Sequence, residues 1–300
     1  MSLASACATT SYAGAPAEVR ARLLEVLADT VAVTALGSRR PELRALVEES
    51  VVGAPEGTAT VVGSPRGWGS GTAAFLNATA VAADQLQDGH RLARGHPASH
   101  VVPAVLALAE ERDLAGDEAL SAVLAGYEVG TRIGRAMGGT PPGVHDIGTW
   151  GAVAVAAAVA RLLRPGDVAA SERAIGLAAS AVLLSDAATV FRGRTGGHAF
   201  LGASVQLGTS LGVSAVAGLE PAEATLDRHF AAVAAHDWSS IPVEVDDQWD
   251  RFEIMGGYLK VHPTCAHLHG VNDAVADLLD SARESGSALR VDDIAEVQVR

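Results

Sequence analysis

Residues 148–163, Gly-Thr-Trp-Gly-Ala-Val-Ala-Val-Ala-Ala-Ala-Val-Ala-Arg-Leu-Leu, decide the fold class of this chain. After the opening at Gly148–Gly151, the stretch Ala152–Leu163 is almost wholly small and apolar, as in a buried helix. Hydrophobic residues make up 49% of the 300 residues but aromatic residues only 4%, so the core must consist mainly of Ala, Val and Leu. Such side chains favour closely spaced helices over an aromatic-rich sandwich. We therefore expect a mainly α fold.

Further helical patterns lie on both sides of this stretch. The residues Val19, Leu23, Val26 and Val31 recur at helical spacing after Pro16, which predicts a helix over Ala17–Leu36. We expect other helices over Pro41–Val52, Thr72–Ala83, Val101–Arg112, Asp117–Met137, Ala170 to about Leu184, and from the Arg192–Gly197 loop to Gly218. In the Asp117–Met137 helix, Glu128 and Arg132 lie inside an otherwise apolar stripe.

Two segments need a separate interpretation. The glycine-rich connection Gly57–Gly71 contains the strand-like residues 58–62, which predicts a hairpin or an extended loop. The longest apolar stretch, Ala174–Phe191, carries Asp186 and three hydroxyl residues, so it is expected to be a buried helix and not a membrane span. We expect no membrane segment.

The amino-acid composition changes from Asp237 onward, where aromatic and acidic residues become frequent. We place a domain boundary near residues 240–255, which gives a large helical domain over 1–245 and the start of a smaller α/β lid domain over 246–300. The lid is expected to contain a strand over 258–261, a helix over 268–281 and a strand over 294–299. Because no partner strand follows, its sheet is expected to be incomplete in this chain.

The net charge limits the partners that the protein can bind, and the cysteine content and N-terminus indicate its location. The net charge of -13 repels nucleic acid and anionic membranes, and the sequence shows no Lys/Arg cluster as a local exception. Cys7 and Cys265 are too few for a disulfide framework, and the first fifteen residues lack the regions of a signal peptide. The expected location is therefore the cytoplasm.

Three histidines, His96, His145 and His267, lie in or beside breaks between helical runs, where a scaffold presents side chains to a cleft. Imidazole titrates near neutral pH, so such residues are candidates for acid/base catalysis. The alternative is that each one caps a helix or bonds a loop carbonyl. The polar loop Asp84–His100, which also holds His90, is the first candidate site element.

Cofactor chemistry finds little support in the sequence. The segment Cys265–His269 lacks the spacing of a zinc site, and the glycine-rich segment Gly63–Gly71 lacks the ending of a phosphate-binding loop. We expect no metal and no other cofactor. A negatively charged substrate would need local cations, for which the candidates are Arg91, Arg94, Arg192, Arg194 and Lys260.

Five blocks in order resemble the MmgE/PrpD family. They are Asp88–Pro103, Ala125–Ile133, Gly143–His145, Gly148–Gly151, and Lys260–Pro263 with His267, His269 and Asp273 after it. The resemblance implies a large helical domain, a smaller α/β lid with the active site between the two, a homodimer and no metal. The family includes 2-methylcitrate dehydratase, cis-aconitate decarboxylase and iminodisuccinate epimerase. Its large domain is completed by a C-terminal segment, which we expect to be absent from this chain.

The resemblance also implies roles for individual residues. His96 and His145 match the proton-transfer pair, and Lys260 matches a lysine that binds a substrate carboxylate. Gln87 stands where relatives carry an acid, so Asp88 or Asp84 is expected to replace it. Phe191 stands where decarboxylases of the family keep a lysine, so Arg192 or Arg194 is expected to supply the positive charge instead. The remaining residues expected to bind substrate are His90, Arg94, Thr149 and His267.

Together these expectations predict that the protein is a cofactor-independent lyase of the dehydratase type. Its substrate would be a small carbon acid that bears one or more carboxylates. One histidine would abstract a proton and the other would protonate the leaving hydroxyl. An epimerase, another isomerase or a decarboxylase acting on a similar acid is the alternative within enzymes. A catalytically inactive binding or assembly subunit is the alternative outside them, motivated by Gln87 and Phe191.

Overall fold

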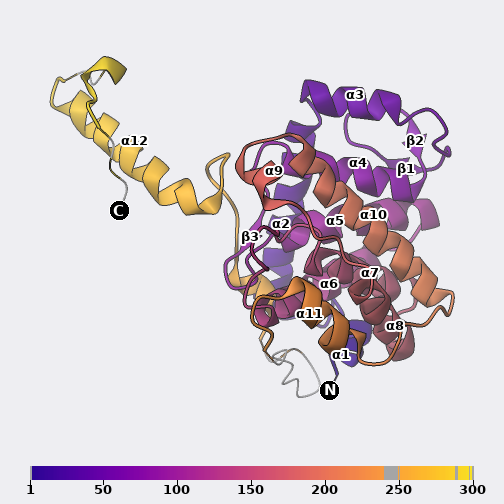
Figure 1. Ribbon diagram of the computed structural model, residues 1–300. Helices are drawn as coiled ribbons and strands as arrows, with labels where there is room; N and C mark the ends of the chain where they lie inside the picture. Colours follow the sequence, from indigo (N-terminus) through magenta and orange to yellow (C-terminus); the bar gives the residue numbers. More distant parts are fainter. Residues whose placement is uncertain (1, 240–248, 250, 288–289, 297, 299–300) are drawn as a thin grey trace. The chain divides into compact units, whose positions relative to one another are not determined.

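The computed structural model of the protein describes residues 2–239, 249, 251–287, 290–296 and 298. Helices dominate it, which confirms the mainly α fold class (Figure 1). The α-helices are α1 (Leu3–Thr9), α2 (Ala17–Gly37), α3 (Pro41–Glu49), α4 (Ser70–Ala82), α5 (Pro97–Arg112), α6 (Gly116–Ala136), α7 (Trp150–Leu163), α8 (Val168–Ala179), α9 (Ala187–Phe191), α10 (Gly196–Val216), α11 (Ala231–Ala234) and α12 (His269–Glu284). A π-helical turn covers Leu226–Phe230, and 3₁₀ turns cover Glu253–Gly256, Ala266–Leu268 and Val291–Asp293.

The chain divides into two compact units, a first unit over Met1–Leu259 and a second unit over Lys260–Arg300. The domain boundary predicted after residue 245 lies outside the described residues. In the second unit α12 is amphipathic, and its apolar residues Val275 and Leu278 are exposed. The strand predicted over 294–299 is not present in the residues described there, 294–296 and 298.

Helix α7 is the centre of the first unit, as its composition predicts (Figure 1). Every residue from Trp150 to Leu162 is buried, and α6, α10, α8 and α5 pack around the helix. Four glycines allow the close approach: a Cβ added at any of them would lie 2.6–2.7 Å from the nearest atom of α7. They are Gly126 and Gly130 of α6 and Gly208 and Gly212 of α10. The core is thus made dense by short distances between helices.

Two predicted helix boundaries are wrong. Helix α5 begins at Pro97 and not at Val101, because proline suits the first helical turn and Asp88 bonds the free amides of that turn. His100 therefore lies in a buried helix and not in a loop. The apolar stretch Ala174–Phe191 is not one helix, since α8 ends at Ala179 and the Asp186 carboxylate caps the separate helix α9.

The strands are short and form two pairs. Strands β1 (Ala59–Thr60) and β2 (Gly67–Trp68) pair antiparallel, which confirms the hairpin expected in the glycine-rich connection. Strands β3 (Gly89–His90) and β4 (Gly257–Tyr258) also pair antiparallel, with Gly89 opposite Tyr258. The strand predicted over 258–261 is therefore one residue earlier and shorter than expected. This pair joins the candidate loop to the end of the first unit.

One described helix, α10, is long and apolar enough to cross a membrane by length and composition alone. In this structure the helix packs against α7, α4 and α8, and its Gly208 and Gly212 face α7. About 44% of its most apolar window is buried. The helix therefore serves here as one wall of the core.

Candidate active site

The loop before α7 is held in place by main-chain bonds to the segment before α9. The amide of His145 donates to the carbonyl of Ser185 at 2.9 Å, and the amide of Ala187 donates to the carbonyl of Gly143 at 2.9 Å. The Thr149 hydroxyl donates to the carbonyl of Asp146 at 2.6 Å and closes the turn into the helix. These bonds fix the position of His145 at the start of the central helix.

His145 and Asp146, neighbours in the chain, are joined by a side-chain contact. Nδ1 of His145 lies 2.9 Å from Oδ1 of Asp146, and both side chains are largely buried. The Ile147 amide nitrogen also lies 3.2 Å from Nδ1. Nδ1 therefore either accepts from this amide or donates to the Asp146 carboxylate. We assign the proton to Nδ1, because a lone pair facing a carboxylate at this distance would be repelled. Nε2 is then the basic nitrogen of the ring.

His96 is held by Asp88 in a related way. Its Nδ1 lies 2.6 Å from the Asp88 carbonyl oxygen, which can only accept, so Nδ1 carries the proton and Nε2 is the basic nitrogen. The carboxylate of Asp88 accepts from the amides of Ala98 and Ser99 and from the Ser99 hydroxyl. Asp88 therefore caps α5 and positions the histidine that starts it.

The Asp88 carboxyl group is fully enclosed, and this affects its protonation. Burial raises the pKa of Asp88 to about 6, although its hydrogen bonds with Ala98 and Ser99 favour the charged form and oppose the shift. The group thus titrates close to neutral pH, in direct contact with the helix that carries His96. That protonation state is coupled to the stability of the fold, because the folded and unfolded chains bind this proton with different affinity.

A third imidazole, that of His100, joins the other two. Its Nδ1 lies 2.8 Å from the carbonyl oxygen of His96, so it also carries its proton on Nδ1. The ring lies against Trp150 at a centroid distance of 5.7 Å, and its Nε2 is buried without a hydrogen bond. Burial lowers the pKa of His100, against the opposing influence of the His96 carbonyl and Asp146.

These residues, His96, His100, His145 and Asp146, form what we call the histidine cluster. Burial on its own would raise the pKa of Asp146, but the hydrogen bond from His145 and the nearby His145, His96 and His100 outweigh it and hold the pKa below its usual value. Oδ2 of Asp146 is enclosed without a hydrogen bond, and a Cβ added at Gly95 would lie 2.7 Å from it. A carboxylate thus lies among three imidazoles that share one tautomer.

One edge of the cluster faces helix α9. The ring of Phe191 meets the ring of His145 edge to face at a centroid distance of 5.5 Å, and 77% of Phe191 is exposed. The next cations along the chain, Arg192 and Arg194, are also exposed. The structure therefore brings the two predicted carboxylate-binding arginines onto the segment that borders His145.

Other predicted site residues lie elsewhere. Asp84 forms an ion pair with Arg40 at 2.5 Å, Arg94 is exposed, and Thr149 is buried with its hydroxyl used inside the turn. Lys260, which is buried, and His267, which is exposed, belong to the second unit. Of the predicted residues, the structure thus brings His96 and His145 near the carboxylate of Asp146. Asp88 contacts His96 through its carbonyl oxygen.

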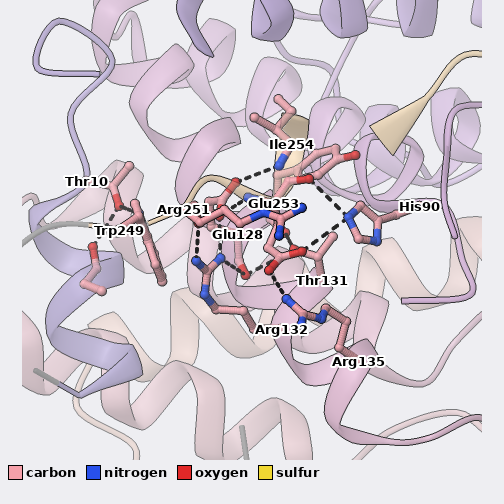
Figure 2. A network of polar contacts seen from close by, with 12 residues as sticks. Thr10, His90, Glu128, Thr131, Arg132, Arg135, Trp249, Arg251, Glu253 and Ile254 are labelled. Carbon is pink, nitrogen blue, oxygen red and sulfur yellow. Dashed lines mark hydrogen bonds and ion pairs between the residues drawn. The ribbon is translucent and has the colours of Figure 1, made fainter. Parts of the chain in front are cut away.

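His90 belongs to a second buried group, the carboxylate–arginine network, built on the α6 residues Glu128, Arg132 and Arg135 (Figure 2). The Glu128 carboxylate pairs with Arg132 and accepts from the amides of Glu253 and Ile254 at 2.8 and 3.0 Å. Burial raises the pKa of Glu128, and the Arg132 charge and these two amides oppose that shift. The network fixes the chain that enters β4.

Four further contacts belong to this network and to the His90 loop beside it. Figure 2 shows Arg132 between Glu128 and the ring of Trp249, whose centroid lies 4.2 Å from the guanidinium carbon. Arg135 pairs with the Glu253 carboxylate. Nε2 of His90 lies 3.1 Å from the Glu253 carbonyl oxygen, while its Nδ1 accepts from the Ala93 amide. Both ring nitrogens of His90 are therefore used to hold the loop.

The sequence reasoning missed Asp146 and His100 as site residues. Asp146 directly follows a histidine already singled out, and a carboxylate beside an imidazole is a signal that could have identified it. His100 was assigned to a loop because the start of α5 was placed too late. Within the described residues, no group of three or more His, Cys, Asp or Glu side chains could hold a metal ion.

The relatives compared with this chain are named as cis-aconitate decarboxylases or as similar to them. The chain is 27% identical to cis-aconitate decarboxylase from Aspergillus terreus over 312 residues, covering 95% of this chain and 61% of the relative. It is 34% identical to the cis-aconitate decarboxylase-like protein oryM from Aspergillus oryzae over 175 residues, covering 54% of this chain and 36% of that protein. The chain thus spans about a third to three fifths of the length of these relatives.

The family comparison covers the part of the chain that holds the histidine cluster. The sequence model of the MmgE/PrpD N-terminal domain matches residues 1–237, which include α1 to α11 and every member of the cluster. The match agrees with the resemblance carried by the blocks around His96 and His145. The chain belongs to the MmgE/PrpD family.

Proposed function

We propose that the protein is a lyase of the dehydratase type that acts on a small carboxylate-bearing carbon acid, with His145 and His96 as its proton-transfer groups. The observation that supports this most is the histidine cluster: Nδ1 of His145 lies 2.9 Å from Oδ1 of Asp146, and the imidazoles of His96 and His100 are near enough to lower the pKa of that carboxylate. His96, His100 and His145 each carry the proton on Nδ1, where a carbonyl or carboxylate oxygen holds it. Of these rings, His96 and His145 are only partly buried, and we assign proton transfer to their Nε2 atoms, while His100 is enclosed.

The hydrogen bond from Nδ1 to Asp146 suits His145 for the role of base. When Nε2 of His145 takes the α-proton of the substrate, the ring becomes a cation beside a carboxylate that is already ionised, which stabilises it. The C–H electron pair forms the new double bond. For this step His96 starts as an imidazolium, protonated on both ring nitrogens, and its Nε2 gives a proton to the β-hydroxyl group, which leaves as water. One substrate thus gives one unsaturated acid and one water, His145 ends with the α-proton, and proton exchange with solvent restores both rings.

Carboxylate binding is assigned to cations near this chemistry. Arg192 and Arg194 follow the Phe191 ring that borders His145, and their charge would stabilise the enolate-like intermediate. Lys260 and His267 are proposed to contact substrate on the basis of the family resemblance. Replacing Lys260 with Ala is expected to raise KM more than it lowers kcat.

The names of the relatives favour decarboxylation as the second candidate reaction. In that case the bond between carbon and a carboxylate breaks, carbon dioxide leaves, and a protonated histidine of the cluster delivers a proton to the carbanion. Phe191, in place of the lysine that decarboxylases keep, is the reason that we rank dehydration first. An epimerase would use the same histidines to remove and return one proton.

The test is a panel of small di- and tricarboxylates, including cis-aconitate and hydroxylated acids of the citrate type, followed by NMR in D₂O. Water loss is expected for a hydroxy acid. Release of carbon dioxide would instead establish the decarboxylase, and deuterium incorporation without net conversion the epimerase. Binding without exchange or conversion would contradict every enzymatic form and favour a binding subunit.

Substitutions tie the activity to the cluster. His145→Ala and His96→Ala are each expected to lower turnover about 10²- to 10⁴-fold, the usual contribution of a proton-transfer group. His229→Ala removes a histidine outside the cluster and serves as the control. Full turnover in both cluster variants would refute the mechanism. The homodimer implied by the resemblance stays a prediction, which a mass measurement in solution tests.

A further inference from the structure

Three arginines that are separated in the sequence line one pocket of the first unit. Arg39 follows α2, Arg44 lies in α3, and Arg66 lies between β1 and β2. In Figure 1 α3 and the strands β1 and β2 lie at the same end of the first unit, and residues of α3 and of the connection between the strands line the pocket. The pocket has a volume of about 720 Å³, which is in the range of small-molecule sites. None of its lining residues belongs to the histidine cluster.

The charge of this pocket is opposite to that of the whole chain. Its lining residues carry three guanidinium groups and one carboxylate, that of Glu48, in a protein with a net charge of -13. Among the described side chains, Arg39 and Arg44 are exposed and form no ion pair within 4.0 Å. Three guanidinium groups against one carboxylate leave a net positive charge, which favours the binding of an anion.

Arg66 is the fixed member of the three. Its Nη2 donates to the Ala54 carbonyl at 2.9 Å, and its guanidinium carbon lies 4.7 Å from the centroid of the Trp68 ring. Nε of Arg66 is buried and makes no hydrogen bond. Nη1 also donates to the Val51 carbonyl at 3.4 Å, so these contacts hold the positive charge of Arg66 at the pocket wall, where it attracts an anion.

The rest of the pocket wall is largely apolar. Val47 and Val51 line it from the α3 side, and Val62 and Trp68 line it from the hairpin side. Val51 is 44% exposed, so this apolar surface is in contact with solvent in the free protein. An apolar group placed against these side chains would gain free energy by leaving water.

We propose that this arginine pocket, formed by Arg39, Arg44 and Arg66, binds an organic anion. The ligand has a doubly charged acidic group that faces the arginines, and an apolar or aromatic body that lies against Val47, Val51 and Val62. A phosphate monoester that carries an aromatic group has this chemistry. The site is separate from the proposed proton-transfer chemistry and holds a second kind of ligand.

Three probes separate the two parts of the ligand, and their binding to the full chain is measured by calorimetry and ligand-observed NMR. Phenyl phosphate carries both charge and ring, inorganic phosphate carries only the charge, and phenol carries only the ring. Phenyl phosphate is expected to bind tightest, with an affinity that falls as salt is added. If inorganic phosphate binds as tightly as phenyl phosphate, the apolar half of the proposal is wrong. If phenyl phosphate does not bind, the whole proposal is wrong.

A double variant locates the binding. Arg39→Gln with Arg44→Gln removes two exposed charges outside any ion pair, and folding is checked by circular dichroism. The double variant is expected to bind phenyl phosphate about tenfold more weakly or worse, as for the loss of charge-assisted hydrogen bonds. Arg164→Gln, at another exposed arginine, is the control and should bind normally. Equal affinity in the double variant and the control would overturn the proposal.

Discussion

Oδ1 of Asp146 lies 2.9 Å from Nδ1 of His145, the residue directly before it in the chain. The turn that closes through Thr149 makes this contact between neighbours possible. The same carboxylate is close enough to His96 and His100 for their charges to lower its pKa. Asp146 thus connects three imidazoles from two different segments of the chain, and we expect it to position the proton-transfer groups.

Asp146→Asn tests this positioning role. The amide keeps the shape of the side chain but removes the negative charge, so the proton of His145 is expected to move from Nδ1 to Nε2. Turnover is then expected to fall about 10²- to 10⁴-fold, because the ring no longer offers its basic nitrogen. Kinetics measure the loss, and ¹⁵N NMR of the imidazoles reports the tautomer.

Asp113→Asn is the matched control, because it removes the same charge at an exposed residue that ends α5 in the left-handed conformation. That variant should keep both turnover and the imidazole spectrum. An unchanged tautomer of His145 in Asp146→Asn would contradict the positioning role, even if activity fell for another reason.

Gly95→Ala tests how closely the cluster is packed. The new methyl group would lie 2.4 Å from Cζ2 of Trp150 and 2.7 Å from Oδ2 of Asp146. We expect the free energy of unfolding to fall by about 1–3 kcal/mol, as for other overpacked sites. Gly71→Ala in α4, where no atom lies within 4 Å, should instead stabilise the protein by up to about 1 kcal/mol. Urea unfolding measures both, and equal effects would contradict the packing.

Asp88→Asn tests the linkage between folding and pH. Because the folded pKa of Asp88, about 6, lies above the ordinary value of 3.8, the folded protein keeps a proton that the unfolded chain releases between these values. Stability from this group is therefore present below about pH 4 and is lost as the pH rises to about 6, a change of about 3 kcal/mol. The asparagine variant should lack this loss.

The measurement for Asp88 is the free energy of unfolding of both proteins from about pH 4 to 7, taken as a difference at each pH. The difference removes the contributions of other titrating groups, among them Glu128, whose pKa burial raises as well. Parallel stability curves for the two proteins would show that Asp88 has an ordinary pKa in the fold.

Glu128→Gln tests the carboxylate–arginine network. The substitution leaves the buried guanidinium of Arg132 without its counterion, which is expected to lower the free energy of unfolding by about 3–5 kcal/mol. Hydrogen exchange should speed up at the amides of Glu253 and Ile254, which donate to this carboxylate. Glu118→Gln is the control, because its pair with Arg161 is partly exposed and should contribute less than about 1 kcal/mol.

The sequence predicts the helical framework well because the helices carry their own signals. The apolar pattern of α2 and the alanine run of α7 both occur where they were expected, with ends within two residues. The start of α5 was missed because Asp88, a remote residue, caps it in place of a local one. Helix ends that depend on long-range hydrogen bonds are not visible in periodicity.

The candidate site was predictable only in part. His96 and His145 are predicted because they lie in breaks between helical runs and in sequence blocks that resemble the family. Their approach to Asp146 depends on the packing of α5 against α7, which the sequence does not reveal. The unpaired charge of Arg39 and Arg44 was invisible for the same reason, since the pocket forms only when α3 packs near the hairpin. In the network, by contrast, the spacing of Glu128 and Arg132 marked a pair four residues apart.

The glycines that let α6 and α10 approach α7 also limit how this protein can vary. At Gly126 or Gly208 the smallest possible substitution already places a methyl group against backbone of the central helix. At both positions a backbone carbonyl of α7, that of Ala154 or Ala152, lies within 2.8 Å of the new methyl group, and no change of a neighbouring side chain can remove a carbonyl. Neutral drift is therefore closed off at these two glycines, because any larger residue would push the helices apart.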